Sequence, residues 1–135
     1  MLKMSPYLSF KGTCEAAFTF YAQTLGGKVG ELFRYGGSLM EGEAPADWAD
    51  KIMHGSVTVG GVLLMGADVT PERYEESKGF TLSLHMSDTA EAERIFNALA
   101  GDGRIVLPLE KTFWAAKFGM VVDRFGTPWT INCDA

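Results

Sequence analysis

The sequence repeats one pattern of elements in its two halves, and this repeat narrows the folds open to the chain more than any other feature. Leu8 matches Leu82 and Ala17 matches Ala92, so equivalent positions lie about 75 residues apart. Solenoid repeats have periods of roughly 20 to 50 residues, and the sequence shows no period of that length. We therefore predict two copies of one module rather than an array of short repeats.

The first half predicts the element order β-α-β-β-β. Apolar and polar residues alternate over 4–10, as expected of a strand that buries one face. Thr13 is placed to cap the helix that follows, and Gly26-Gly27 is placed to end it. A hairpin at Gly60-Gly61 joins the last two strands of this half. The remaining strands are expected at 28–35, 51–59 and from residue 62 onward.

The second half predicts the same order. Alternation over 80–85 indicates a strand, and Asp88 followed by Glu91 resembles a capping box at the start of a helix. The apolar residues of this helix share one face, as helical spacing requires, and are Ala92, Ile95, Phe96 and Leu99. Further strands are expected at 104–113, 116–122 and 128–133.

Length, charge and composition exclude several classes of protein. A chain of 135 residues is long enough for one compact domain. The formal charge of −5 disfavours a surface that tracks nucleic-acid phosphates. No apolar run reaches the roughly 18 to 20 residues that a membrane span needs, and the N-terminus turns polar too soon for a signal peptide. We expect a cytoplasmic protein with neither nucleic-acid nor membrane partners, in which Cys14 and Cys133 are plain thiols.

The repeat predicts an α+β fold in one domain over residues 1–135, with module one at about 1–70 and module two at about 78–135. Each module places a helix on one face of a short sheet, and the other face must find a partner. Pairing the two sheets would make a cup, and concave sites of this kind bind small ligands. The polar residues expected to point into the cup are Tyr7, Ser9, Thr81, Ser83, His85, Thr130 and Asn132.

Several strings of the sequence together carry a resemblance to a known family. They are Pro6-Tyr7-Leu8-Ser9-Phe10, Glu15-Ala16-Ala17-Phe18-Thr19-Phe20-Tyr21, Ile52-Met53-His54, Leu64-Met65-Gly66-Ala67-Asp68, Thr112-Phe113-Trp114 and Asp123-Arg124-Phe125-Gly126-Thr127-Pro128-Trp129. Over essentially its whole length the chain resembles the vicinal-oxygen-chelate superfamily of glyoxalases, bleomycin-resistance proteins and dioxygenases, and within it the PhnB-like branch. The resemblance implies two β-α-β-β-β modules paired into a cup, and a homodimer by analogy.

The resemblance also indicates which chemistry to test. Metal-dependent members carry His, Gln or Glu on four cup-facing strands, and the matching positions here fall at or near Ser5 or Tyr7, Met65, Thr81 and Thr130. None of these is a usual ligand of a divalent metal, so we expect no metal and no other cofactor. The branch often carries a demethylubiquinone methyltransferase label. We discount that activity, because the sequence has no glycine-rich nucleotide-binding turn.

The candidate functional residues each allow a structural alternative. His54 is the candidate catalytic base, with Asp68 or His85 nearby, or else a hydrogen-bonded residue of a half-buried strand. Asp68 is expected to satisfy backbone donors. Trp114 either grips a ligand or packs in a dimer. The acidic segment 36–50 is either a lid that attracts a cation or a solvated loop. Residues expected in the core include Trp129 and Phe20.

Three functions follow from these residues. The leading hypothesis is a PhnB-like protein that binds or converts a small molecule without a metal, using His54, Trp114 and the polar residues of the cup. The second is a metal-dependent lyase or oxygenase that uses ligands such as His54, His85 and Asp68. The third is a ligand-sequestering protein similar to those of bleomycin resistance. The sequence does not decide whether the chain is an enzyme, because one fold hosts many chemistries.

Overall fold

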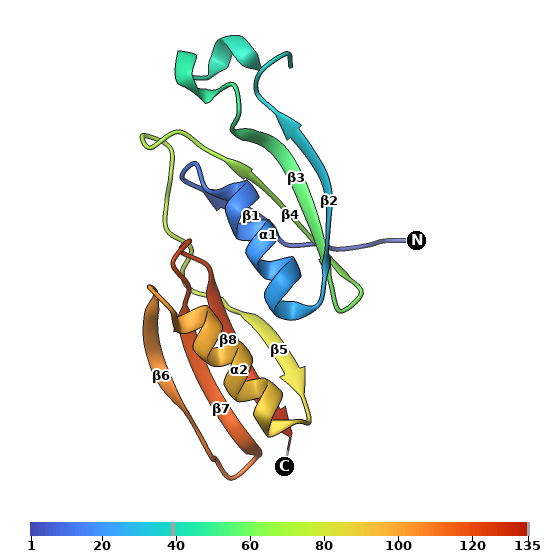
Figure 1. Ribbon diagram of the computed structural model, residues 1–135, viewed down its shortest axis with the longest axis vertical. Helices are drawn as coiled ribbons and strands as arrows, with labels where there is room; N and C mark the ends of the chain where they lie inside the picture. Colours follow the sequence, from blue (N-terminus) through green and yellow to red (C-terminus); the bar gives the residue numbers. More distant parts are fainter. Residues whose placement is uncertain (39, 135) are drawn as a thin grey trace. The chain divides into compact units, whose positions relative to one another are not determined.

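The computed structural model describes residues 1–38 and 40–134, which form two compact units, Met1–Glu75 and Glu76–Ala135. Each unit has the order β-α-β-β-β, so the predicted α+β architecture of two similar modules is confirmed (Figure 1). The expected pairing of the modules into a cup stays a prediction. The helices of the described residues are too short and too polar to cross a membrane.

The first unit is a four-stranded sheet with one helix. Its strands are β1 (Tyr7–Phe10), β2 (Lys28–Arg34), β3 (Ile52–Val59) and β4 (Val62–Asp68), and its helix is α1 (Cys14–Leu25). Two short 3-10 turns, η1 (Glu41–Glu43) and η2 (Ala46–Trp48), lie between β2 and β3. The strand order is β1-β4-β3-β2, in which β1 runs parallel to β4 and the other pairs are antiparallel.

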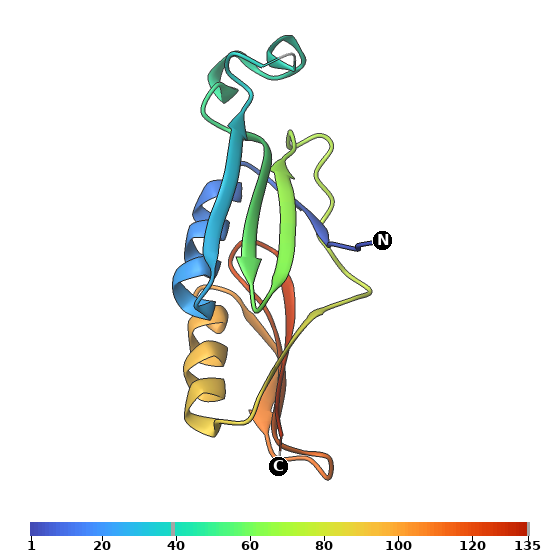
Figure 2. The same cartoon turned by 90° about the vertical axis from the view of Figure 1, so that its right-hand side faces the viewer.

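The second unit repeats this arrangement. Its strands are β5 (Leu82–Met86), β6 (Arg104–Glu110), β7 (Ala115–Val122) and β8 (Pro128–Asp134), and its helix is α2 (Thr89–Ala100). The strand order is β5-β8-β7-β6, again with the first strand parallel to the last. Figure 2 shows each helix on one face of its own sheet, so each sheet has a face that its helix leaves open.

The core of each unit lies between helix and sheet. In the first unit Phe10 and Phe18 are fully buried and meet edge to face, with ring centroids 5.5 Å apart. Gly66 of β4 permits this packing, because a Cβ there would lie 2.7 Å from the Leu8 carbonyl oxygen and 3.0 Å from the Phe18 ring. In the second unit the predicted apolar face of α2 is confirmed, since Ala92, Ile95, Phe96 and Leu99 are all buried. Trp129 is buried as expected.

Two expectations for α1 were wrong. Thr13 is the residue before the helix, but its side chain makes no capping hydrogen bond. The Asp68 side chain takes that role from the end of β4 and accepts a 2.8 Å hydrogen bond from the Cys14 amide. The buried face of α1 includes Phe18, whereas Phe20 is only partly covered. By contrast, Asp88 caps α2 as predicted and accepts a hydrogen bond from the Ala90 amide.

Most strand boundaries agree with the sequence to within three residues. The strand expected at 4–10 begins at Tyr7, since the preceding Pro6 has no N–H to donate to a sheet. At Gly60-Gly61 both residues have positive φ values, 55° and 79°, as a tight hairpin between antiparallel strands requires.

Asp68 is the buried polar group that connects most elements of the first unit. It is 1 % exposed, and its carboxylate accepts from the amides of Cys14 and Ile52, both at 2.8 Å. Its own carbonyl oxygen accepts from the Tyr35 hydroxyl at 2.8 Å. The end of β4 is thereby joined to the start of α1, the start of β3 and the segment after β2. The expectation that Asp68 satisfies backbone donors is confirmed.

Asp68→Ala should lower the free energy of unfolding by roughly 2 to 4 kcal/mol, because two buried backbone amides lose their acceptor. Urea denaturation followed by circular dichroism measures this change. The matched control is Asp47→Ala, which removes an exposed carboxylate from the same unit and should leave stability within about 0.5 kcal/mol. Equal stability of the two variants would contradict the role given to Asp68.

Candidate functional site

The open face of the first sheet carries polar and aromatic side chains. On β1, Leu8 and Phe10 are buried on the helix side, while Tyr7 and Ser9 alternate with them and are exposed. Tyr7 lies opposite Met65 in the register of β1 and β4, and Met65 lies opposite Ser56 of β3. The open face therefore combines residues of β1, β4 and β3, and the alternation along β1 is the one predicted.

Three rings gather on this face. The Tyr7 hydroxyl lies 3.1 Å from Nδ1 of His54 and the ring centroids lie 5.6 Å apart. Phe33 stands opposite His54 in the register of β2 and β3, and its ring stacks on the imidazole at 6.3 Å with an interplanar angle of 22°. Tyr7 and Phe33 are each about half exposed, at 52 % and 48 %. The imidazole thus lies between two accessible aromatic rings.

The hydrogen bond of His54 constrains what its ring can do. Burial raises the pKa of the Tyr7 hydroxyl, and the neighbouring Cys14 and Tyr35 raise it further. The hydroxyl therefore keeps its proton at neutral pH and can donate it to Nδ1 of His54. A neutral imidazole that accepts at Nδ1 carries its own proton on Nε2. In this arrangement His54 offers a ligand a hydrogen-bond donor rather than a base.

The open face of the second sheet carries the other predicted contacts. The Thr81 and Thr130 hydroxyls lie 2.7 Å apart and form a hydrogen bond. Ser83 stands opposite Thr130, and His85 stands opposite Asn132 in the register of β5 and β8. Thr130 is buried, while Ser83 and His85 are exposed. The alternation along β5 and β8 thus places these residues on one face, as expected.

Aromatic rings extend this second face. Phe118 of β7 lies opposite Asn132 of β8, and its ring meets Trp114 at 5.2 Å. Trp114 in turn meets Phe113 at 4.8 Å, and these two are 51 % and 98 % exposed. Phe118, Asn132 and His85 are neighbours across β7, β8 and β5, and Trp114 contacts the Phe118 end of this series.

The predicted site residues divide between the two units. Tyr7, Ser9 and His54 share the open face of the first sheet, whereas Thr81, Ser83, His85, Trp114, Thr130 and Asn132 belong to the second unit. Both carboxylate oxygens of Asp68 accept backbone amides, and Nδ1 of His54 lies within hydrogen-bond distance of the Tyr7 hydroxyl, not of Asp68. Sequence reasoning missed Phe33 and Phe118. Strand alternation could have identified Phe118, but register shifts in β2 hide Phe33 from such a pattern.

The described residues do not fit a metal site of the usual kind. Among residues 1–38 and 40–134 no three His, Cys, Asp or Glu side chains gather as metal ligands would. The positions that the resemblance implies for metal ligands, at or near Tyr7, Met65 and Thr130, carry hydroxyl or thioether groups. Both cysteines are free and buried, and burial together with the nearby Asp68 strongly raises the pKa of the Cys14 thiol. Cys14 is therefore not an activated thiolate.

Comparison with protein families decides the relationship. The model of the family described as 3-demethylubiquinone-9 3-methyltransferase matches residues 2–132, almost the whole chain. The chain belongs to this family. Its predicted place in the PhnB-like branch is thereby confirmed.

Two relatives match the chain over nearly its full length. Protein YjdN of Escherichia coli (strain K12) is 35% identical over 145 residues, which cover 97% of the chain and 95% of YjdN. The crystal structure of PA1353 from Pseudomonas aeruginosa is 48% identical with a TM-score of 0.88, covering 99% of this chain and 98% of that one.

A more distant structure shows the fold alone. A glyoxalase/bleomycin resistance protein/dioxygenase family enzyme from Burkholderia phytofirmans PsJN is 10% identical with a TM-score of 0.65, covering 97% of each chain. The predicted glyoxalase-like fold is thus confirmed for this PhnB-like chain.

The tautomer of His54 is directly measurable. At pH 8, long-range ¹H–¹⁵N spectra of the imidazoles should show His54 with its proton on Nε2, because Nδ1 accepts from Tyr7. In Tyr7→Phe this preference should weaken toward a mixture of tautomers, while the signals of His85 serve as an internal control and stay unchanged. A His54 ring that carries its proton on Nδ1 in the wild-type protein would contradict the arrangement.

Proposed function

We propose that this PhnB-like chain binds a small organic molecule on the open face of its first sheet. The observation that carries the proposal is the hydrogen bond between the Tyr7 hydroxyl and His54, beside the stacked Phe33. The imidazole is half-buried and held by its neighbours, so its orientation is established before a ligand arrives. Pre-ordered side chains lower the entropic cost of binding.

The chemistry of the three rings defines the class of ligand. The exposed rings of Tyr7 and Phe33 favour a flat, unsaturated molecule, since aromatic faces pack on one another over a large area. The Nε2–H group of His54 favours an oxygen acceptor on that molecule, such as a carbonyl or an oxyanion. We therefore propose a flat carbonyl or phenolate compound as the ligand. If the chain also converts it, the same donor would stabilise negative charge on that oxygen.

The polar residues of the second sheet remain proposed ligand contacts. Thr81, Ser83 and His85 on β5, with Thr130 and Asn132 on β8, offer hydroxyl, imidazole and amide groups on one face. Trp114 adds an accessible ring beside them. Orientation by such groups needs no chelated ion, and we propose that binding proceeds without a metal.

The methyl transfer in the family's name needs a cofactor, and neither module has a turn of the kind that binds one in Rossmann-type methyltransferases. Rossmann-type methyltransferases bind a nucleotide cofactor at a glycine-rich turn that follows a parallel strand. The turn between β1 and α1 contains one glycine, Gly12, and the turn between β5 and α2 contains none. Because neither turn is glycine-rich, we propose ligand binding rather than methyl transfer for this chain.

Coumarin and 2-quinolone, both flat carbonyl compounds, should bind with dissociation constants in about the millimolar range. Titrations followed by ¹H–¹⁵N spectra should shift the amides of Phe33, His54 and Ser56, and EDTA should change nothing. His54→Ala should weaken binding about fivefold to tenfold, the loss expected for one hydrogen bond.

The matched control for this experiment is Arg94→Ala, which removes an exposed polar side chain from α2 and touches neither group of proposed ligand contacts. Naphthalene, which has the same flat shape but no oxygen, should bind more weakly than coumarin. The proposal fails if His54→Ala binds coumarin as the wild type does, or if binding requires an added divalent ion. Tight binding of a basic compound in place of these probes would favour a sequestering function.

We further propose that the chain is a cytoplasmic homodimer. The two free, buried thiols suit a reducing compartment. The edge strand β6 exposes consecutive apolar residues, Ile105 at 53 %, Val106 at 54 % and Leu107 at 42 %. An accessible apolar edge of this kind is usually covered by a partner, and a second copy of the chain would provide one.

Val106→Lys should weaken dimer formation at least tenfold, because a charge replaces an apolar side chain at the proposed interface. Sedimentation velocity over a range of concentrations measures this change. Val62→Lys is the matched control, since Val62 is 49 % exposed in the hairpin of the first unit. A wild-type protein that sediments as a monomer at every concentration would refute the dimer.

A further inference from the structure

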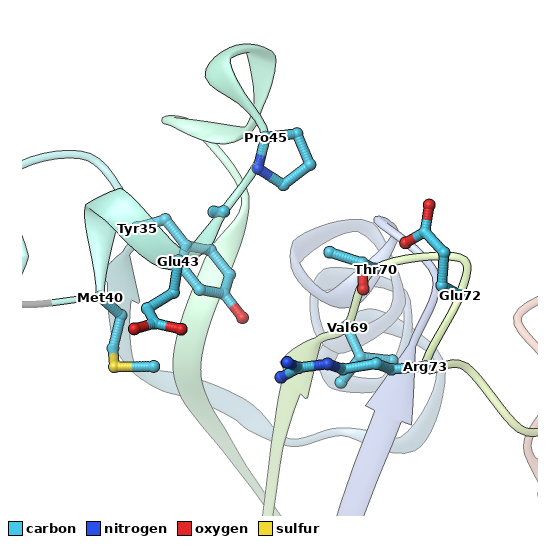
Figure 3. Close-up of a pocket in the computed structure, with 9 residues that line it drawn as sticks. Tyr35, Met40, Glu43, Pro45, Val69, Thr70, Glu72 and Arg73 are labelled. Carbon is cyan, nitrogen blue, oxygen red and sulfur yellow. The ribbon is translucent and has the colours of Figure 1, made fainter.

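A cavity of about 370 Å³ lies in the first unit, apart from the three rings of the open face. One wall comes from the end of β2 and the acidic segment after it, with Tyr35, Met40 and Pro45. The other wall comes from the segment after β4, with Val69, Thr70 and Arg73 (Figure 3). Small-molecule sites begin at roughly this volume. Met40 and Pro45 lie in the segment 36–50 that was predicted as either a lid or a solvated loop, and the other four residues were not predicted as ligand contacts.

Arg73 supplies an unpaired positive charge to this cavity. Figure 3 shows its guanidinium extended across the space toward the wall that carries Tyr35, while the Glu72 carboxylate turns away. The cavity lining also includes Glu43, whose carboxylate lies on the Tyr35 side of the space. The Thr70 carbonyl accepts from the amides of both Arg73 and Tyr74, which makes a tight turn at the base of this side chain. No carboxylate of the described residues forms an ion pair with Arg73. The guanidinium is thus free to bind an anion.

Tyr35 supplies a hydrogen-bond acceptor on the opposite wall. Its hydroxyl donates its only proton to the Asp68 carbonyl oxygen at 2.8 Å. Burial raises the pKa of this hydroxyl, the Asp68 carboxylate adds to the rise and Arg73 opposes it, so the proton stays in place at neutral pH. The ring is held edge to face by the buried Trp48, with centroids 5.8 Å apart. The Tyr35 oxygen can therefore only accept from a ligand.

We propose that this cavity is a second binding site, for a small carboxylate whose neighbouring carbon carries a hydroxyl or amino group. The carboxylate would pair with the Arg73 guanidinium, which has the planar donor geometry for two parallel hydrogen bonds. The hydroxyl or ammonium hydrogen would be accepted by the Tyr35 oxygen. The apolar remainder of the ligand would rest on Met40, Pro45 and Val69.

Three compounds of nearly equal size test both hydrogen bonds: 3-phenyllactate, phenylalanine and 3-phenylpropanoate. All three carry the carboxylate and the phenyl ring, but 3-phenylpropanoate lacks the donor on the neighbouring carbon. Titrations followed by ¹H–¹⁵N spectra should shift the amides of Tyr35, Thr70 and Arg73. At least one of the first two compounds should bind in about the millimolar range, and at least threefold more tightly than 3-phenylpropanoate. The tighter of the two identifies the ligand as a hydroxy acid or an amino acid.

Two variants separate the contributions of the two walls. Arg73→Gln should weaken binding of all three compounds about tenfold. Tyr35→Phe should remove the preference over 3-phenylpropanoate and leave the affinity for that compound unchanged. Arg94→Gln is the matched control, because it makes the same change on the exposed surface of α2 in the other unit. Spectra of each variant without ligand show whether it is folded.

The proposal is overturned if Arg73→Gln binds as the wild type does, if the shifted amides lie elsewhere, or if 3-phenylpropanoate binds as tightly as the other two compounds. Coumarin binding to Arg73→Gln should be unchanged, since His54 and Phe33 are intact in this variant. The same experiment therefore distinguishes failure of this cavity from failure of the proposed function.

Discussion

The buried carboxylate of Asp68 is the interaction on which the rest of the first unit depends. Its oxygens accept from the first turn of α1 and from the start of β3, and its carbonyl accepts from Tyr35. The strand that bears it is bonded to β1 on one side and to β3 on the other. The open face and the cavity therefore share one support, because residues that define both are attached to this end of β4.

The second unit also has a buried carboxylate, but the groups that donate hydrogen bonds to it are close in sequence. Asp123 is buried at the turn between β7 and β8, where its carboxylate accepts from the amides of Phe125 and Thr127 and from the Trp129 indole. These partners all lie within six residues of Asp123. The same kind of group thus closes a turn in one unit and connects distant elements in the other. Modules with one topology need not share the interactions that stabilise them.

Membership of a family and possession of its named activity are separate matters for this chain. The full-length match and the relatives establish the PhnB-like family. Both carboxylate oxygens of Asp68 accept backbone amides, and Nδ1 of His54 lies within hydrogen-bond distance of the Tyr7 hydroxyl. A glyoxalase-like fold does not by itself decide the activity, since function depends on the residues that the strands present.

The sequence by itself determined the element order, the duplication, the buried face of α2 and the polar faces of β1, β5 and β8. These depend on periodicity and local capping, which each segment carries alone, as Asp88 does for α2. Only the tertiary structure decided that Asp68 caps α1, that Phe33 stacks on His54, and that Tyr35 and Arg73 face one cavity. These partners lie 20 or more residues apart, and for Phe33 the register shifts of β2 also break the alternation that would reveal it. Such contacts are set by how strands pair and segments pack, so no local pattern encodes them.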